Sequence, residues 1–137
     1  MKVYKTKAKK FSGSDYHEIK EKTKSFYKQI IKKTKRRPYV KSAYFKKQKI
    51  FLELFWNHLF EKNFWDQSRR MKFFACGIEL IQKAHLDPIS KENPNKKGEI
   101  LHRFAGVSAE SEQFFVQIKE EKRTGQKWLV SIFPKDK

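Results

Sequence analysis

Four side chains in the last third of the chain could together carry out proton transfer and charge stabilisation. They are His102, Arg103, Lys119 and Ser131. An imidazole titrates near neutral pH and acts as a general base or a general acid. A lysine or arginine stabilises a developing negative charge, and a hydroxyl can orient a phosphate. This set suits cleavage of RNA by attack of the ribose 2′-hydroxyl on its own phosphodiester, which requires no metal.

Three predicted β-strands, joined as an antiparallel meander, must position these residues. Residues 98–107, 114–119 and 127–134 alternate in polarity and are rich in β-branched and aromatic side chains. A polar break at 108–112 and a turn at Thr124-Gly125 separate them. The register of the strands decides which residues meet, because a slip of one residue exchanges the two faces of a sheet.

The second hairpin of this meander fits a three-residue turn at 124–126. That turn pairs Ile118 with Ile132, which keeps apolar residues together, and it places Lys119 opposite Ser131. In the first hairpin, a pairing of Val107 with Phe114 places His102 opposite Lys119.

The two pairings predict that His102, Lys119 and Ser131 form one row across the sheet. Arg103 would then need a position at the sheet end, or a bulge, to join them. Beside this catalytic row we predict a further set of RNA-contacting residues within the meander: Gln117, Phe104, Phe133, Arg123 and Lys127.

Positive charge is concentrated in the first part of the chain, although the whole chain carries a formal net charge of +18. Residues 1–50 contain 18 Lys or Arg but only 3 Asp or Glu, whereas the rest of the chain is nearly neutral. Such an arm attracts phosphates without regard to sequence, so we add Arg36 and Arg37 to the predicted RNA contacts. A solubilising tail, or a contact with an acidic membrane surface or an acidic partner, would have the same composition.

The remaining sequence predicts one domain that contains three helices before the meander. Residues 1–13 are expected to form a flexible basic leader and residues 14–137 the domain, with a basic helix within 14–40, an aromatic helical pair within 45–85 and the meander at 98–134. Ser14 is the expected N-cap of the first helix, at 15–33, and the pair spans about 45–58 and 67–84. Helices followed by strands predict an α+β fold with the helices on one face of a small antiparallel sheet.

Several classes of protein are disfavoured by composition. A single cysteine excludes a disulfide framework and indicates a reducing, cytoplasmic location. The four histidines have no metal-site spacing, so neither a metal nor another cofactor is expected. No segment reaches the roughly 18 apolar residues of a membrane span, and the Lys-rich N-terminus lacks the apolar core of a signal peptide.

The second half of the chain, from Arg69 through Pro134, resembles the barnase/colicin/RelE-like group of small ribonuclease toxins in its order of helix and meander. The likeness is carried by Ile100–Phe104, Phe114–Lys119 and Trp128–Pro134. The resemblance implies a small antiparallel sheet backed by helices and a metal-independent endoribonuclease of toxin type. It further implies two partners: RNA, free or on the ribosome, and a cognate antitoxin protein. From the residues alone, a nucleic-acid-binding module or a protein-interaction domain without catalysis fits equally well.

Overall fold

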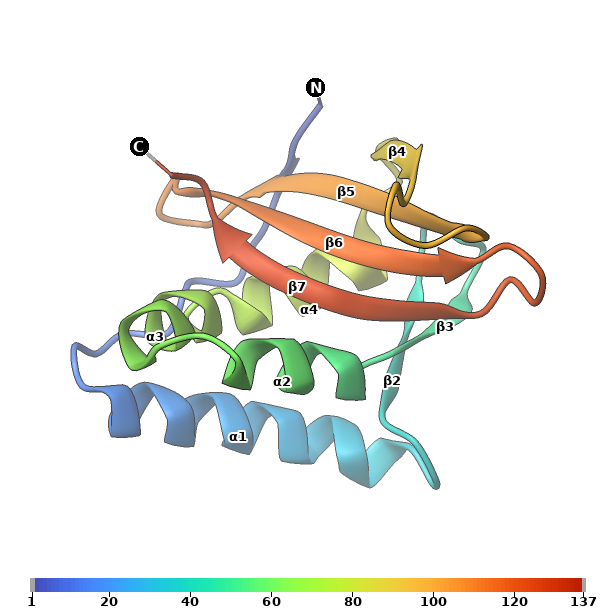
Figure 1. Cartoon of the computed structure of the whole chain (residues 1–137). Coiled ribbons are helices and arrows are strands. Elements are labelled where there is room, and N and C mark those ends of the chain that lie inside the picture. The colour runs from blue at the N-terminus through green and yellow to red at the C-terminus, as the bar shows by residue number, and fades with distance from the viewer. Residues whose placement is uncertain (1, 137) are drawn as a thin grey trace.

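A seven-stranded mixed sheet and four helices make up the fold, in a computed structural model that describes residues 2–136 (Figure 1). The elements in chain order are β1 (Tyr4–Lys5), α1 (Tyr16–Lys33), β2 (Tyr39–Ser42), β3 (Gln48–Phe51), α2 (Glu53–Phe60), α3 (Phe64–Met71), α4 (Phe74–Lys83), β4 (Ile89–Glu92), β5 (Glu99–Val107), β6 (Gln113–Glu121) and β7 (Lys127–Pro134).

The predicted arrangement of helices on a small antiparallel sheet is wrong. The sheet has the order β1-β5-β6-β7-β3-β2, with β4 also on β5, and it curls into a half-barrel. Strands β1 and β5 run parallel, as do β3 and β7. The meander β5-β6-β7 is present and antiparallel. The additional strands have only two to four residues, too few for a local alternation pattern to reveal them.

The observed helices agree in part with those predicted from the sequence. Helix α1 lies where it was predicted, although its N-cap is Asp15, whose carboxylate accepts from the Glu18 amide, and not Ser14. The predicted helix at 45–58 is wrong in its first half, because residues 48–51 form β3 and the helix begins only at Glu53. The predicted helix at 67–84 is two helices, α3 and α4, and Asn63 caps the first of them.

The core lies between the helices and one face of the meander (Figure 1). Its most buried large side chains include Phe55, Phe74 and Phe114. Helix α4 packs so closely on β7 that a Cβ at Gly77 would lie 2.4 Å from Ile132 Cδ1. We call the meander face that meets the helices the inner face and the opposite one the outer face.

Part of the expected flexible leader has a defined place in the fold. Tyr4 and Lys5 pair with Gly106 and Val107 at the edge of β5. The Glu79 carboxylate on α4 accepts hydrogen bonds from the backbone amides of the next residues, at 2.9 Å from both Lys7 and Ala8. These contacts are between positions some seventy residues apart, which composition alone does not reveal.

Candidate nucleic-acid interface

The register of the meander differs from the predicted one by a single residue. Val107 pairs with Gln113, so His102 lies opposite Ile118, and Leu101 lies opposite Lys119. His102 and Lys119 therefore project from opposite faces of the sheet. The predicted row of His102, Lys119 and Ser131 is wrong, because the structure does not bring the imidazole to the other two side chains.

A β-bulge changes the second hairpin as well. The register shifts between Gln117 and Ile118, so Ser131 pairs with Gln117, and Lys119 pairs with Trp128. An extra residue in one strand bends the ladder locally. Lys119 and Ser131 still share the outer face, but they are not opposite each other.

His102 belongs to the inner face, where it is only 7% exposed. Its Nδ1 lies 2.6 Å from Ser90 Oγ on β4, and its Nε2 lies 2.8 Å from Glu120 Oε1 on β6. The Phe45 ring packs edge-on against the imidazole at 5.0 Å between centroids. Both ring nitrogens thus have partners within the protein, and the imidazole cannot reach a ligand on the outer face.

The same network continues to Lys127, another predicted RNA contact. Its ammonium lies 3.7 Å from Glu120 Oε2 and donates to Gln48 Oε1 and to the carbonyl of Gly125. It also lies 4.8 Å from the centre of the Phe45 ring. Lys127 is buried, as is Phe104, which was also predicted to contact RNA. These residues connect β3, β4, β5, β6 and β7 from within, which is a structural role.

The order Ser90, His102, Glu120 has the residue types of a hydrolase triad. However, Ile89 and Lys91, on either side of Ser90, line a cleft on the outer face. Because side chains alternate along a strand, Ser90 points away from that cleft, towards His102. The arrangement satisfies buried polar groups and offers no substrate site of its own.

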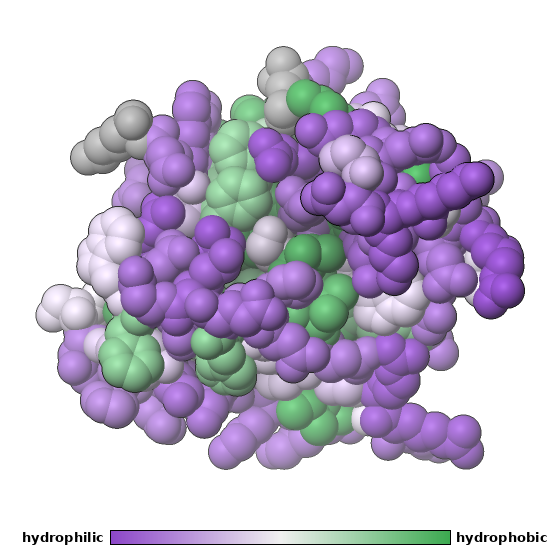
Figure 2. Space-filling model, viewed as in Figure 1, coloured by the Kyte–Doolittle hydropathy of each residue, from purple (hydrophilic) through white to green (hydrophobic). Residues whose placement is uncertain are grey.

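The outer face gathers the remaining predicted residues of the meander. Arg103, Gln117, Lys119, Ser131 and Phe133 all project from it, since their pairing partners lie on the same side of the ladder. The face also contains Phe115, opposite Phe133, and Trp128, opposite Lys119. Figure 2 shows apolar surface over the end of the sheet nearest the C-terminus, surrounded by hydrophilic side chains.

Cations on this face are held over aromatic rings. The Arg103 guanidinium lies 5.7 Å from the Phe115 ring centre and 5.5 Å from that of Phe133. The Lys119 ammonium lies 4.9 Å from the centre of the Trp128 ring. Arg70, at the end of α3, reaches the Phe133 ring at 5.4 Å. Such contacts orient flexible cationic side chains.

One carboxylate borders the cationic group. Glu99 Oε2 lies 3.4 Å from Lys119 Nζ and 3.1 Å from Lys96 Nζ, and Asn93 donates to Oε1. Burial acts to raise the pKa of Glu99, but the hydrogen bonds from Lys96 and Asn93 and the charge of Lys119 outweigh it and hold the pKa below its ordinary value. Glu99 is therefore ionised at neutral pH.

A cleft of about 400 Å³ opens on the outer face between β4 and the meander. Arg103, Gln117 and Phe115 form one side of it, and the loop that follows β4 forms the other. A concave site with an aromatic wall and a guanidinium is suited to a single unstacked base and its phosphate.

The other predicted contacts are in separate places. Arg123 lies in the β6–β7 turn with its side chain 88% exposed, 3.8 Å from Glu121. Arg36 and Arg37 lie between α1 and β2, where Arg37 forms an ion pair with Glu53. Phe115, Trp128 and Arg70 were missed. Alternation in residues 114–119 already places Phe115 beside Gln117, whereas the contact of Arg70 with β7 has no signal in the sequence.

Comparison with protein-family models, curated proteins and solved structures found no match for this chain. Within residues 2–136, no group of His, Cys, Asp and Glu is arranged to hold a metal ion. None of the helices in that range is both long and apolar enough to cross a membrane.

Proposed function

We propose that the protein binds single-stranded RNA on the outer face of the meander and cleaves it there as a metal-independent endoribonuclease. The observation that carries this proposal is the group of Arg103 and Lys119, each held over aromatic rings on one open sheet face. Exposed aromatic rings stack unpaired bases, and interleaved cations hold phosphates. Aromatic rings without cations, or cations without aromatic rings, would not by themselves indicate binding of single-stranded RNA.

In the proposed reaction the ribose 2′-oxygen forms a bond to phosphorus while the bond to the 5′-oxygen breaks. Arg103 and Lys119 stabilise the additional negative charge of the phosphorane, and Gln117 and Ser131 orient its oxygens. The ionised Glu99 accepts the 2′ proton, and Lys119 donates a proton to the leaving 5′-oxygen. Glu99 and Lys119, whose nearest atoms are 3.4 Å apart in the unliganded protein, thus replace His102 as the proposed acid–base pair.

A non-catalytic RNA-binding module is the second candidate. It is favoured by the position of His102 on the inner face, since the outer face presents no imidazole among residues 2–136. In the toxin-type proposal the outer face is also the surface that a cognate antitoxin would cover, because blocking it would stop both binding and cleavage.

The test is incubation of the purified protein with total RNA in EDTA, followed by analysis of the RNA fragments. We expect cleavage by the parent protein and its loss in Lys119→Ala and Glu99→Gln. Arg103→Ala should also weaken binding, because one phosphate contact is lost. The slope of the logarithm of the binding constant against the logarithm of the salt concentration should become shallower by about 0.7. Lys24→Ala, an exposed lysine on α1, is the matched control and should behave like the parent.

The outcomes separate the candidates. Intact RNA whose binding depends on Arg103 supports the binding module. Cleavage that is unaffected by all three outer-face variants contradicts this site. Binding that is equally weak in Lys24→Ala contradicts a localised interface and leaves only general attraction by net charge.

A further inference from the structure

The outer face does not end at the meander. Strand β3 pairs in parallel with β7, and Phe51 lies beside Trp128 in that pairing. Partners in a ladder project from the same side of the sheet. Within the β2–β3 hairpin, Tyr39 pairs with Phe51, and Lys41 pairs with Lys49. These four side chains therefore extend the outer face across the hairpin.

The hairpin repeats the pattern of cations over rings that the meander shows. The Lys49 ammonium lies 4.6 Å from the centre of the Tyr39 ring, and the Arg37 guanidinium lies 3.9 Å from that of Phe51. The two rings are in edge contact, with 6.3 Å between their centroids. Together with Lys119 over Trp128, they form three neighbouring ring–cation pairs on β2, β3 and β7.

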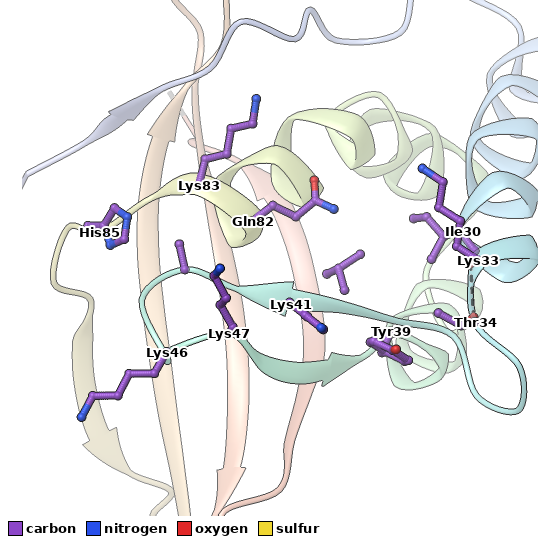
Figure 3. A pocket seen from close by; sticks show the side chains of 12 residues that line it. Ile30, Lys33, Thr34, Tyr39, Lys41, Lys46, Lys47, Gln82, Lys83 and His85 are labelled. Atoms are coloured by element: carbon purple, nitrogen blue, oxygen red, sulfur yellow. Dashed lines mark hydrogen bonds between the residues drawn. The ribbon is translucent and has the colours of Figure 1, made fainter.

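Two clefts flank the hairpin and share Lys33 and Tyr39 in their walls. The larger, about 1090 Å³, lies between the hairpin and the C-terminal ends of α1 and α4 (Figure 3). Figure 3 shows Lys41 and Tyr39 on β2 and Gln82 on α4 among the residues that line this cleft. The smaller, about 560 Å³, is formed by the segment between α1 and β2 together with β3.

The linings of both clefts are strongly basic. Five lysines line the larger cleft, and four further Lys or Arg line the smaller. Neither lining includes an Asp or a Glu. Within residues 2–136, Arg37 alone of these cations forms an ion pair, with Glu53. The remaining cations are available to an external polyanion.

The hairpin keeps this charge at a cost to its own stability. Lys41 and Lys49 are directly opposite in an antiparallel pair, where like charges repel. Lys46 and Lys47 in its turn have φ values of 56° and 65°, a left-handed conformation that favours glycine or asparagine. A sequence selected only for hairpin stability would not combine these two features.

We infer that a single strand of RNA continues from the outer face of the meander, over Trp128 and Phe51, onto the hairpin and into the clefts beside β2. An extended site of this kind suits a chain of several nucleotides, because it alternates rings and cations along a continuous path. The path through Trp128 rests on the proposed function, whereas the hairpin site does not require cleavage on the meander.

The test measures binding of two fluorescent oligouridines, a tetramer and a dodecamer, as a function of salt concentration. Single-strand-binding domains of the OB fold engage about 4 to 16 nucleotides, and on that scale only the longer probe is expected to extend from the meander to the hairpin. In Lys41→Ala/Lys49→Ala, which removes two phosphate contacts, we expect dodecamer binding to weaken by at least about tenfold, since even one charged hydrogen bond contributes about that much. The slope of the logarithm of the dodecamer binding constant against the logarithm of the salt concentration should become shallower by about 1.4. Binding of the tetramer should not change.

Thermal melts distinguish this effect from a structural one. Removing the like-charge pair should raise Tm by about one to three degrees while binding falls. Lys24→Ala/Lys28→Ala removes the same charge from the exposed surface of α1 and is the matched control. An equal loss of dodecamer binding in this control would overturn the inference, as would unchanged dodecamer binding in the hairpin variant.

NMR titration of the parent protein with the dodecamer locates the site independently of the variants. Shift changes at Tyr39, Lys41 and Lys49 support the inference, and changes confined to Arg103 and Phe115 overturn it while leaving the proposed function intact. The converse result, with changes at the hairpin and none on the meander, contradicts the proposed function instead. Binding of ATP in the clefts without binding of either RNA would also overturn the inference.

Discussion

The replacement His102→Ala should destabilise the fold and not act only on cleavage. The imidazole contacts Ser90 Oγ and Glu120 Oε1 at 2.6 and 2.8 Å and is almost fully buried. Alanine would remove both hydrogen bonds and leave a void beside Phe45. Each lost hydrogen bond costs about 0.5–1.5 kcal/mol and the void adds a further cost, so a total loss of about 3 kcal/mol is expected.

This loss can be measured by thermal and urea unfolding. For a chain of 137 residues, about 3 kcal/mol corresponds to a decrease in Tm of about 10 °C. His17→Ala, an exposed histidine on α1, is the control and should change Tm very little. The reasoning is refuted if His102→Ala melts within about 2 °C of the parent, and the catalytic role is restored if that stable variant has lost RNA cleavage.

Three further predictions concern the inner face and its supports. Glu79→Gln should lower stability by about 1–2 kcal/mol at pH 7, and the difference should shrink as pH falls through the carboxyl pKa, measured by urea unfolding from pH 7 to 3. Burial acts to raise the pKa of Glu79, but hydrogen bonds from the Lys7 and Ala8 amides and the Tyr4 hydroxyl outweigh it and lower the pKa. The ionised carboxylate therefore stabilises the fold at pH values above the pKa that Glu79 has in the unfolded chain. Gly77→Ala should cost about 1–3 kcal/mol, because the new methyl group overlaps Ile132, and an unchanged Tm would contradict the close packing of α4 on β7. Cys76 should resist a thiol reagent at pH 8 until denaturant is added, since burial is the main reason that its pKa is raised to about 11.

Local patterns in the sequence predict the elements but not their pairing. Helix α1 follows from acidic residues at its start and an apolar stripe, and β5, β6 and β7 follow from alternation. Strands β1, β2, β3 and β4 have only two to four residues each, and β1 and β3 also pair with strands far away in sequence, so no local window contains enough residues to indicate them. The fold therefore differs from the prediction mainly in its short strands.

The two faces of the meander could not be distinguished from the sequence. Phe114 and Phe115 are adjacent, as are Ile132 and Phe133, so each strand presents large apolar side chains to both sides. Only the position of the helices makes Phe114 a core residue and leaves Phe115 on the outer face. Because of this ambiguity, His102 and Lys127 were predicted to belong to the RNA site, although both lie on the inner face and contribute to the stability of the fold.

The inner face has a polar end because the helices do not cover the full length of the strands. Nine residues of β5 span about 30 Å. Helix α4 meets one end, where Leu80 packs near Gly106, and the β2–β3 turn closes the other, with Phe45 against Phe104 and His102.

At that end, His102 and Lys127 both contact the Glu120 carboxylate and both pack against the Phe45 ring. A buried polar group that loses its partner costs free energy, so replacing any of these residues should lower the stability of the fold. The outer-face cations Arg103, Lys41 and Lys49 satisfy no buried partner, so replacing Arg103 should leave stability nearly unchanged and replacing Lys41 and Lys49 should raise it slightly. Stability and RNA binding are therefore expected to depend on opposite faces of the same strands, which is why variants of one face can test the other.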